Sequence, residues 1–354
     1  MIRRFTWVEL LVVIIIIAVS LAILIPVLNS HREAQRRATC INNSRQIGLA
    51  FQSYASTFGN AFPPSAKITN AADGTQTVGG MSFLVHVGSF MGIGETVIYF
   101  HLGPRGYNAD PEDTSNKAVV EAMNTQFSEF ICPSGPSRQA SSAQPQAGIT
   151  NYKAMGATTR GSLVMVVDPQ ATPPYGTMAP INDTLPIHPD GAIFPAIGNL
   201  PVAAYLDGLS HTICIIETID EAASRWTVGK EATLVGMPQA SSPTGTTPQP
   251  GFNYFVQPGG DYFTWGPNSA VAKAGLRTFL SYDFGPNGAD AGKYEDAGFG
   301  KTPPAYGPSS MHPGVVICCM GDGSTQAMSK QIDAANLFFL ITKSNSDPFC
   351  DPGP

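Results

Sequence analysis

Residues 5–28 form a long apolar run that carries one charge, Glu9, close to its start. From residue 10 to residue 28 only Ser20 and Pro26 are not apolar. A helix of about 20 such residues spans the hydrocarbon core of a bilayer. Two arginines precede the run, at positions 3 and 4, and basic residues hold a short flank in the cytoplasm. We therefore predict a transmembrane helix over residues 5–28 and export of the chain that follows it.

Glu9 is the unusual residue of this segment. A carboxylate inside a membrane segment costs roughly 2.5–3.5 kcal/mol on insertion scales, so its presence calls for a specific role. In a bundle of such helices, Glu9 would pair with the N-terminal amine of a neighbouring chain, and a misplaced chain would leave both charges unpaired. The alternative is a plain signal anchor that tolerates Glu9 near the interface. A removed signal peptide fits poorly, because its apolar core is usually only about 7–15 residues long.

The helical pattern continues beyond Pro26. Small and apolar residues recur at spacings of three and four, which predicts an amphipathic extension over residues 29–60. This stripe packs on the protein's own head or on a neighbouring subunit, and its members are Ala34, Ala38, Ile41, Ser44, Gly48, Phe51, Ala55 and Phe58. Gly59, Asn60 and the pair Pro63-Pro64 are stop signals, so we expect one continuous helix over residues 6–58.

Composition favours a β-rich, loop-rich head over residues 61–354. Charged residues make up 13% of the 354 residues, and the chain holds 36 glycines and 30 prolines. Such a composition favours strands and turns over helices. The predicted class is therefore α+β, with one long helix and a β-rich head, and a flexible loop near residues 238–251. The net charge of −6 and the lack of basic clusters beyond the membrane flank argue against nucleic acid as a partner.

Within the head, local patterns predict individual elements. Residues 314–320 and 324–328 form a hairpin around the Asp-Gly turn at 322–323. The other predicted elements are helices over residues 117–130 and 330–342, and strands over residues 161–168 and 211–218.

The six cysteines contain no C-x-x-C motif, which argues against a zinc ribbon or a thioredoxin-like site. In an exported domain some of them can be oxidised. Cys40 and Cys132 are a candidate pair, because the loop Cys132-Pro133-Ser134 can fold back on the helix; buried free thiols are the alternative. Cys318 and Cys319 are neighbours on a predicted strand, so they point to opposite faces and do not bond each other.

The sequence shows no catalytic signature. Neither G-x-S-x-G nor H-E-x-x-H occurs. Gly300-Lys301-Thr302 imitates the end of a phosphate-binding loop, but Pro303-Pro304 excludes the helix that such a loop needs. We therefore predict no enzymatic activity and assign no catalytic residue. His312 and Asp322 flank the first hairpin strand. Either the two side chains hydrogen-bond to each other, or the side chain of Asp322 stabilises the turn that it forms with Gly323.

The N-terminus resembles that of type IV prepilins, which carry a short basic leader, then Phe-Thr-x-x-Glu, then an apolar helix. Here the leader is residues 1–4 and the motif is Phe5-Thr6-Trp7-Val8-Glu9. The resemblance implies that a prepilin peptidase cuts before Phe5 and that Phe5 is then methylated. It also implies an assembly role for Glu9 and a helix kink at Pro26. Arg4 stands where the family has Gly, and this departure favours an uncleaved chain.

A second resemblance covers most of the chain. His312, nine residues and then Asp322-Gly323 are similar to the His-x9-Asp-Gly domain of a large bacterial family of unknown function with prepilin-type N-termini. Three further segments resemble motifs of that family, namely residues 40–50, 132–134 and 207–212. The resemblance implies a pilin or pseudopilin without a known activity. Pseudopilins can bind calcium through C-terminal loop oxygens, which makes Asp207, Glu217 and Asp322 calcium candidates; no other cofactor is expected.

These patterns predict a pilin-like or pseudopilin subunit of a bacterial pilus or type II secretion machine. It would be held in the inner membrane with its head in the periplasm, and it could enter a filament at the cell surface. Its expected partners are other pilin-like subunits, the prepilin peptidase and the lipid bilayer. The alternative is an uncleaved, membrane-tethered exported binding protein or enzyme that does not polymerise.

Overall fold

The structure is a computed structural model that describes the greater part of the long helix and most of the head. The described residues are 7–70, 76–101, 117–135, 147–157, 191–196, 198–219, 224–229, 231–236, 307–332 and 334–343, with the side chains of 23–30, 68–70, 76–79, 101 and 334–335 outside the description. The predicted strand over 161–168 and the predicted flexible loop over 238–251 lie outside the described residues.

The first described element is one long helix, α1 (Trp7–Thr57), close to the range of 6–58 expected from the sequence. Its 51 residues correspond to a length of about 77 Å, and the helix continues through position 26. Gly59 and Asn60 then adopt positive φ values of 72° and 58°, which turn the chain away from the helix axis. The stop signals in the sequence therefore act where they were predicted.

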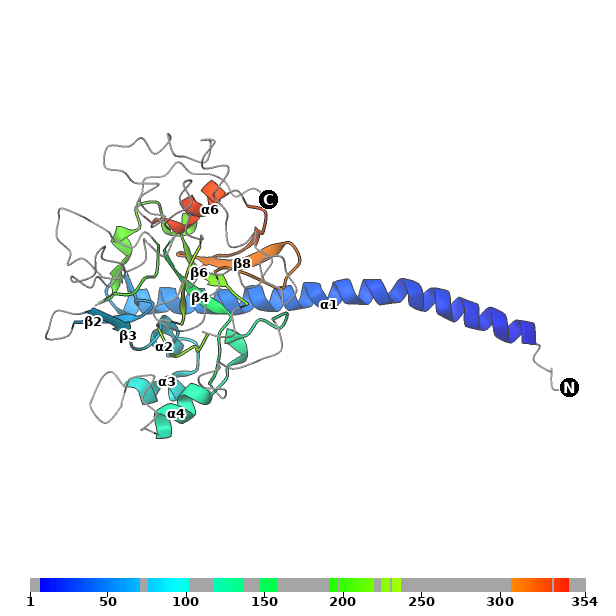
Figure 1. The fold of residues 1–354 in the computed structure, drawn as a ribbon, viewed down its shortest axis with the longest axis horizontal. Coiled ribbons are helices and arrows are strands. Elements are labelled where there is room, and N and C mark those ends of the chain that lie inside the picture. The colour runs from blue at the N-terminus through cyan, green and yellow to red at the C-terminus, as the bar shows by residue number, and fades with distance from the viewer. Residues whose placement is uncertain are drawn as a thin grey trace, which may run out of the picture.

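The two ends of α1 have different surroundings. One part crosses the head and the other projects far beyond it (Figure 1). All residues from 7 to 22 are exposed, whereas Cys40, Ser44, Ile47, Phe51 and Ala55 are buried in the head. The predicted stripe is thus buried over its central part, while Ala34, Ala38 and Phe58 stay exposed. No helix in the described part of the chain combines the length and the apolar character that a membrane span needs.

A five-stranded sheet forms the centre of the head, with the order β7-β4-β6-β8-β9. The strands are β4 (Tyr152–Ala157), β6 (Ile213–Glu217), β7 (Thr233–Val235), β8 (Val315–Met320) and β9 (Thr325–Ser329). Only the β4–β7 pair is parallel. β8 and β9 form the predicted hairpin, and the predicted strand over 211–218 is observed as β6. The class is α+β with a sheet-rich head, as expected.

Helices cover both faces of this sheet. α1 packs against β8, β9 and β6, and its residues Ile47 and Phe51 share a core with Ile215 and Cys319. On the other face, α6 (Ala334–Ile341) places Leu337 in a second core with Val316 and Cys318. Cys318 and Cys319 therefore lie on opposite faces, as the alternation of side chains along a strand requires.

Smaller elements complete the head, with α2–α4 on the side of α1 away from the sheet (Figure 1). They are β1 (Ala61–Phe62), which pairs with β5 (Leu200–Pro201); β2 (Lys67–Asn70), which pairs with β3 (Gln76–Gly79); α2 (Phe83–Gly88), α3 (Gly94–His101) and α4 (Lys117–Asn124); and the 3-10 turns η1 (Ser128–Phe130), η2 (Val202–Ala204) and η3 (Leu209–His211). The buried indole of Trp226 contacts the rings of Phe100 in α3, Phe130 in η1 and the neighbouring Phe127.

The helix predicted over residues 117–130 is wrong in its second half, because α4 ends at Asn124. Gln126 accounts for the break: its Oε1 accepts from the backbone N–H of Ile149 at 2.7 Å, and its Nε2 donates to the carbonyl of Ile149 at 2.9 Å. These two bonds join Gln126 to a segment 23 residues further along the chain, so the backbone at Gln126 is directed toward Ile149 and does not continue the helix. The short final helix, α6, also begins later than the predicted residue 330.

α1 lies close against the hairpin at Gly48. A Cβ atom added there would lie 2.4 Å from Cys319 Sγ and 3.1 Å from the Cα of Gly323. Overpacking of this kind costs about 1–3 kcal/mol. The gain in helix propensity from Gly to Ala is at most about 1 kcal/mol.

Gly48→Ala should therefore lower the free energy of unfolding by about 1–2 kcal/mol. The measurement is chemical unfolding of the full chain in detergent, followed by circular dichroism. Gly198→Ala is the matched control, because nothing lies within 4 Å of a Cβ atom at that position. Equal stability of the two variants would contradict the close contact between α1 and β8.

Candidate functional site

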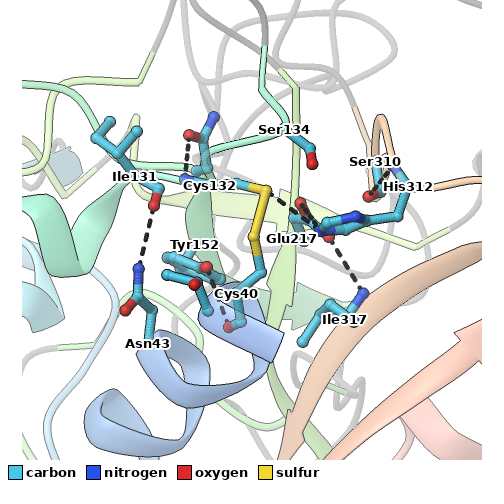
Figure 2. The surroundings of a disulfide bond; sticks show 12 residues. Cys40, Asn43, Ile131, Cys132, Ser134, Tyr152, Glu217, Ser310, His312 and Ile317 are labelled. Atoms are coloured by element: carbon cyan, nitrogen blue, oxygen red, sulfur yellow. Dashed lines mark hydrogen bonds and ion pairs between the residues drawn. A yellow bond between two sulfur atoms is a disulfide. The ribbon is translucent and has the colours of Figure 1, made fainter. Parts of the chain in front are cut away.

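The candidate site lies where α1 enters the head, at a small core that is separate from the two described above. Four separate segments of the chain meet here, from α1, from the loop after η1, from the end of β6 and from the turn before β8 (Figure 2). Their side chains are Glu33, Cys40 and Asn43 from α1, Cys132 and Ser134 from the loop, Glu217 from β6 and His312 from the turn.

A disulfide between Cys40 and Cys132 fastens α1 to the head. The two Cα atoms lie 5.4 Å apart across a sequence separation of 92 residues, and both side chains are buried. Cys40 and Cys132 are the candidate pair predicted from the sequence, on the expectation that the loop at residues 132–134 folds back on the long helix.

Hydrogen bonds fix the backbone on both sides of the disulfide. Asn43 Nδ2 donates to the carbonyls of Ser128 and Ile131, each at 3.1 Å. The N–H of Cys132 donates to Asn151 Oδ1 at 2.9 Å, and the hydroxyl of Tyr152 donates to the carbonyl of Cys40 at 3.1 Å. The position of each sulfur is thus set by hydrogen-bonded neighbours as well as by the covalent bond.

His312 is fully buried beside the disulfide (Figure 2). Its Nδ1 lies 2.5 Å from Oε1 of Glu33, and its Nε2 lies 3.4 Å from Cys132 Sγ and 3.8 Å from Glu217 Oε1. An ionised carboxylate can only accept hydrogen bonds, so Nδ1 of the imidazole carries the hydrogen toward Glu33. In the neutral ring, the lone pair of Nε2 then faces the sulfur of Cys132 and the carboxyl of Glu217.

Glu33 is the partly exposed member of the site, with 29% of its side chain accessible to solvent. Burial acts to raise the pKa of its carboxyl, but hydrogen bonds from His312 and Ser134 outweigh this effect and hold the pKa below its ordinary value. The hydroxyl of Ser134 donates to Oε2 at 3.1 Å. Glu33 therefore stays ionised and holds the imidazole in one orientation.

Glu217 has the opposite environment. Only 1% of the residue is exposed, and burial raises the pKa of its carboxyl to about 7. A hydrogen bond from Ser310 and one from the N–H of Ile317, at 3.3 Å from Oε2, partly oppose this rise. The two carboxyl groups beside the imidazole of His312 therefore differ in pKa, which is lowered for Glu33 and raised for Glu217.

Of the two alternatives left open by the sequence, the hydrogen bond between His312 and Asp322 is not formed. His312 is directed to Glu33, Cys132 and Glu217, while Asp322 Oδ1 accepts from the N–H of Ser324 at 2.8 Å. Asp322 therefore serves the hairpin turn, the other role considered from the sequence. Gly323 completes the turn with a φ of 84°.

The three calcium candidates differ in their surroundings. Glu217 belongs to the cluster with His312 and the two cysteines, and neither Asp207 nor Asp322 is part of it. Among the described residues, the ligand atoms of Cys40, Cys132, Glu217 and His312 lie within 4.8 Å of one another. This set contains sulfur and nitrogen, which calcium does not prefer. Calcium binding itself stays a prediction.

The N-terminal candidates are only partly described. Arg4 and Phe5 lie outside the described residues, so processing at this position stays a prediction. Glu9 lies in the first turn of α1, and position 26 lies within the same continuous helix. Their assembly roles also stay predictions.

Sequence reasoning missed Glu33 and the grouping of His312 with the cysteines. Glu33 precedes Cys40 by seven residues, which is two helical turns, so both side chains lie on one face of α1. That spacing was visible in the sequence. The contact with His312, which is 279 residues away, had no comparable local signal.

Comparison with protein families gives one match over most of the chain. The family is described as a protein of unknown function (DUF1559), and the match covers residues 29–335. No curated protein and no solved structure matches the chain.

The raised pKa of Glu217 predicts how stability depends on pH. Below about pH 4.5 the carboxyl is protonated in both the folded and the unfolded chain, and above about pH 7 it is ionised in both. Between these values only the folded chain keeps the proton, so the free energy of unfolding falls as the pH rises. The loss is roughly 3 kcal/mol at about 1.4 kcal/mol per pKa unit.

Glu217→Gln should therefore reduce the fall in stability between pH 5 and pH 8. The measurement is the free energy of urea unfolding of the disulfide-bonded full chain at a series of pH values. Glu121→Gln, a change at an exposed residue of α4, is the control and should keep the wild-type slope. A Glu217→Gln slope equal to that of the wild type would contradict the assignment.

Proposed function

The chain belongs to the DUF1559 family of proteins of unknown function, and we propose from its architecture that it is a pilin-like or pseudopilin subunit. In this proposal the N-terminal half of α1 is stored in the bacterial inner membrane and can enter a helical bundle with other pilin-like subunits. The head remains outside the bundle, in the periplasm or on a secreted filament.

The division of α1 into two halves carries this proposal. The half inside the head is held by the sheet and by the Cys40–Cys132 disulfide, whereas the other half projects beyond the head (Figure 1). Its large apolar side chains between Trp7 and Leu21 are 41–78% exposed. A soluble monomer rarely leaves so continuous an apolar surface uncovered, so a bilayer or neighbouring helices are its natural surroundings.

Glu9 supports assembly over simple anchoring. It is the single charge between residues 5 and 28, and it lies in the first turn of α1. In a bundle of helices it would pair with the amine of a neighbouring Phe5 and fix the axial register of the subunits. The head, of about 290 residues, is large for a subunit that packs densely along a filament, so a minor or initiating position fits better than that of the major subunit.

The alternative is a membrane-tethered exported binding protein or enzyme. One observation favours it: Arg4 stands where the prepilin peptidase would find Gly, and an uncut leader would leave no free amine at Phe5. In that case the same helix would serve only as an anchor, and the head would carry the function by itself.

Glu9→Ala separates the two roles. Loss of one partner of a buried ion pair costs about 3–5 kcal/mol, so crosslinking between subunits in intact cells should fall by tenfold or more while the protein remains in the membrane fraction. Glu95→Ala, at an exposed position in the first turn of α3, should leave the crosslinks unchanged. Undiminished crosslinking of Glu9→Ala would overturn the assembly role.

Intact mass and N-terminal sequencing of the protein from native membranes address the leader directly. The pilin proposal expects a chain that begins at Phe5, with a methyl group on its amine. A chain that begins at Met1 would instead support the tethered alternative.

A further inference from the structure

The cluster at the helix–head junction holds more potential ligand atoms than its disulfide uses. A disulfide uses only the two sulfur atoms, yet a buried imidazole nitrogen and a buried carboxyl oxygen are held beside them. We propose that, when Cys40 and Cys132 are thiols, these two residues bind one Zn²⁺ ion together with His312 and Glu217.

The distances suit a four-coordinate zinc ion. Zinc lies about 2.3 Å from sulfur and about 2.0–2.2 Å from nitrogen or oxygen, so neighbouring ligand atoms in a tetrahedron are roughly 3.3–3.8 Å apart. Nε2 of His312 is 3.4 Å from Cys132 Sγ and 3.8 Å from Glu217 Oε1. The four ligand atoms lie within 4.8 Å of one another, so opening the sulfur–sulfur bond and small rotations of the side chains complete the site.

The surrounding hydrogen bonds orient the ligands as in other zinc sites. A zinc-bound histidine almost always donates its second ring N–H to a carboxylate or a carbonyl, which fixes its tautomer. Here the Nδ1 of His312 faces Glu33 at 2.5 Å, which leaves Nε2 for the metal. Oε2 of Glu217 accepts from the N–H of Ile317, which leaves Oε1 on the side of His312.

The choice of ion follows from the donors. Thiolate and imidazole ligands select zinc and other soft or borderline cations over calcium or magnesium. Binding converts the two thiols into thiolates and the carboxyl of Glu217 into its carboxylate, and the protons that these groups held pass to solvent. The cation then offsets most of the charge of two thiolates and one carboxylate, a combination that would be costly to bury alone.

Zinc and the disulfide exclude each other, because each sulfur bonds either to the metal or to the other sulfur. Both states connect α1 to the loop after η1, and the zinc state also connects β6 and the turn before β8. The zinc state therefore attaches α1 to the head in a chain whose cysteines have not been oxidised.

Cobalt titration of the reduced full chain in detergent tests this inference. A phosphine reductant opens the disulfide and takes up an oxygen atom from water as its phosphine oxide, which leaves two thiols. Under argon, one equivalent of Co²⁺ should then produce a thiolate-to-cobalt charge-transfer band and the visible bands of tetrahedral cobalt. Zinc should abolish both. The oxidised full chain, without reductant, should give neither band.

Variants assign the site. Cys40→Ser/Cys132→Ser should remove the charge-transfer band, and Glu217→Gln and His312→Gln should each weaken cobalt binding by tenfold or more. Cys318→Ala/Cys319→Ala is the matched control, since it removes two buried thiols from the sheet and should leave the bands intact.

Three results would overturn the inference. They are the absence of cobalt bands in the reduced wild type, equal bands in its oxidised form, and loss of the bands in Cys318→Ala/Cys319→Ala with their retention in Cys40→Ser/Cys132→Ser. The comparison of reduced with oxidised wild type requires no variant, so it decides the question even if a substituted chain does not fold. The outcome is independent of whether the protein assembles into filaments.

Discussion

Attachment of α1 to the head is the constraint on which the rest of this structure depends. The helix is both the projecting element and a part of the hydrophobic core, because Ile47, Phe51 and Ala55 fill the space between the sheet and α2–α4. Without that packing, the sheet would lose the cover of one face. The disulfide adds a covalent link at the point where the helix leaves the core, and closure of so long a loop removes considerable entropy from the unfolded chain.

Polar chemistry is concentrated at this same point. A buried imidazole, a buried carboxyl and two sulfur atoms meet here. The imidazole of His312 contacts Glu33 of α1, the carboxyl of Glu217 accepts from the N–H of Ile317 in β8, and the backbone N–H of Cys132 donates to Asn151. Buried polar groups are costly unless they are satisfied, so such a cluster makes the relative position of these segments specific. The proposed zinc state would give this cluster a chemical role in addition to its structural one.

The sequence predicted the elements whose signals are local. α1 follows from its apolar run and its helical spacing, its end follows from Gly59 and Asn60, and the β8–β9 hairpin follows from an Asp-Gly turn between two apolar segments. β4 gave no such signal, because Tyr152–Ala157 contains small residues and a lysine and is buried on both faces by its neighbours. α4 is shorter than predicted because Gln126 bonds to a backbone that lies far away in sequence. The site was predicted in pieces: its cysteines were paired, but Glu33 and His312 meet only through the tertiary fold.

The attachment of α1 to the head at Cys40 leaves a long part of the helix projecting beyond the head. About 33 residues separate Trp7 from Cys40, which corresponds to an arm of about 50 Å. A change of 5° in the angle between helix and head would move the far end by about 4 Å, a little less than the ~5.4 Å rise of one helical turn. Because the disulfide at Cys40 attaches α1 to the head, a few buried side chains determine the direction of the long projecting part of the helix. A small change in the angle at this attachment point therefore produces a large displacement at the far end of α1.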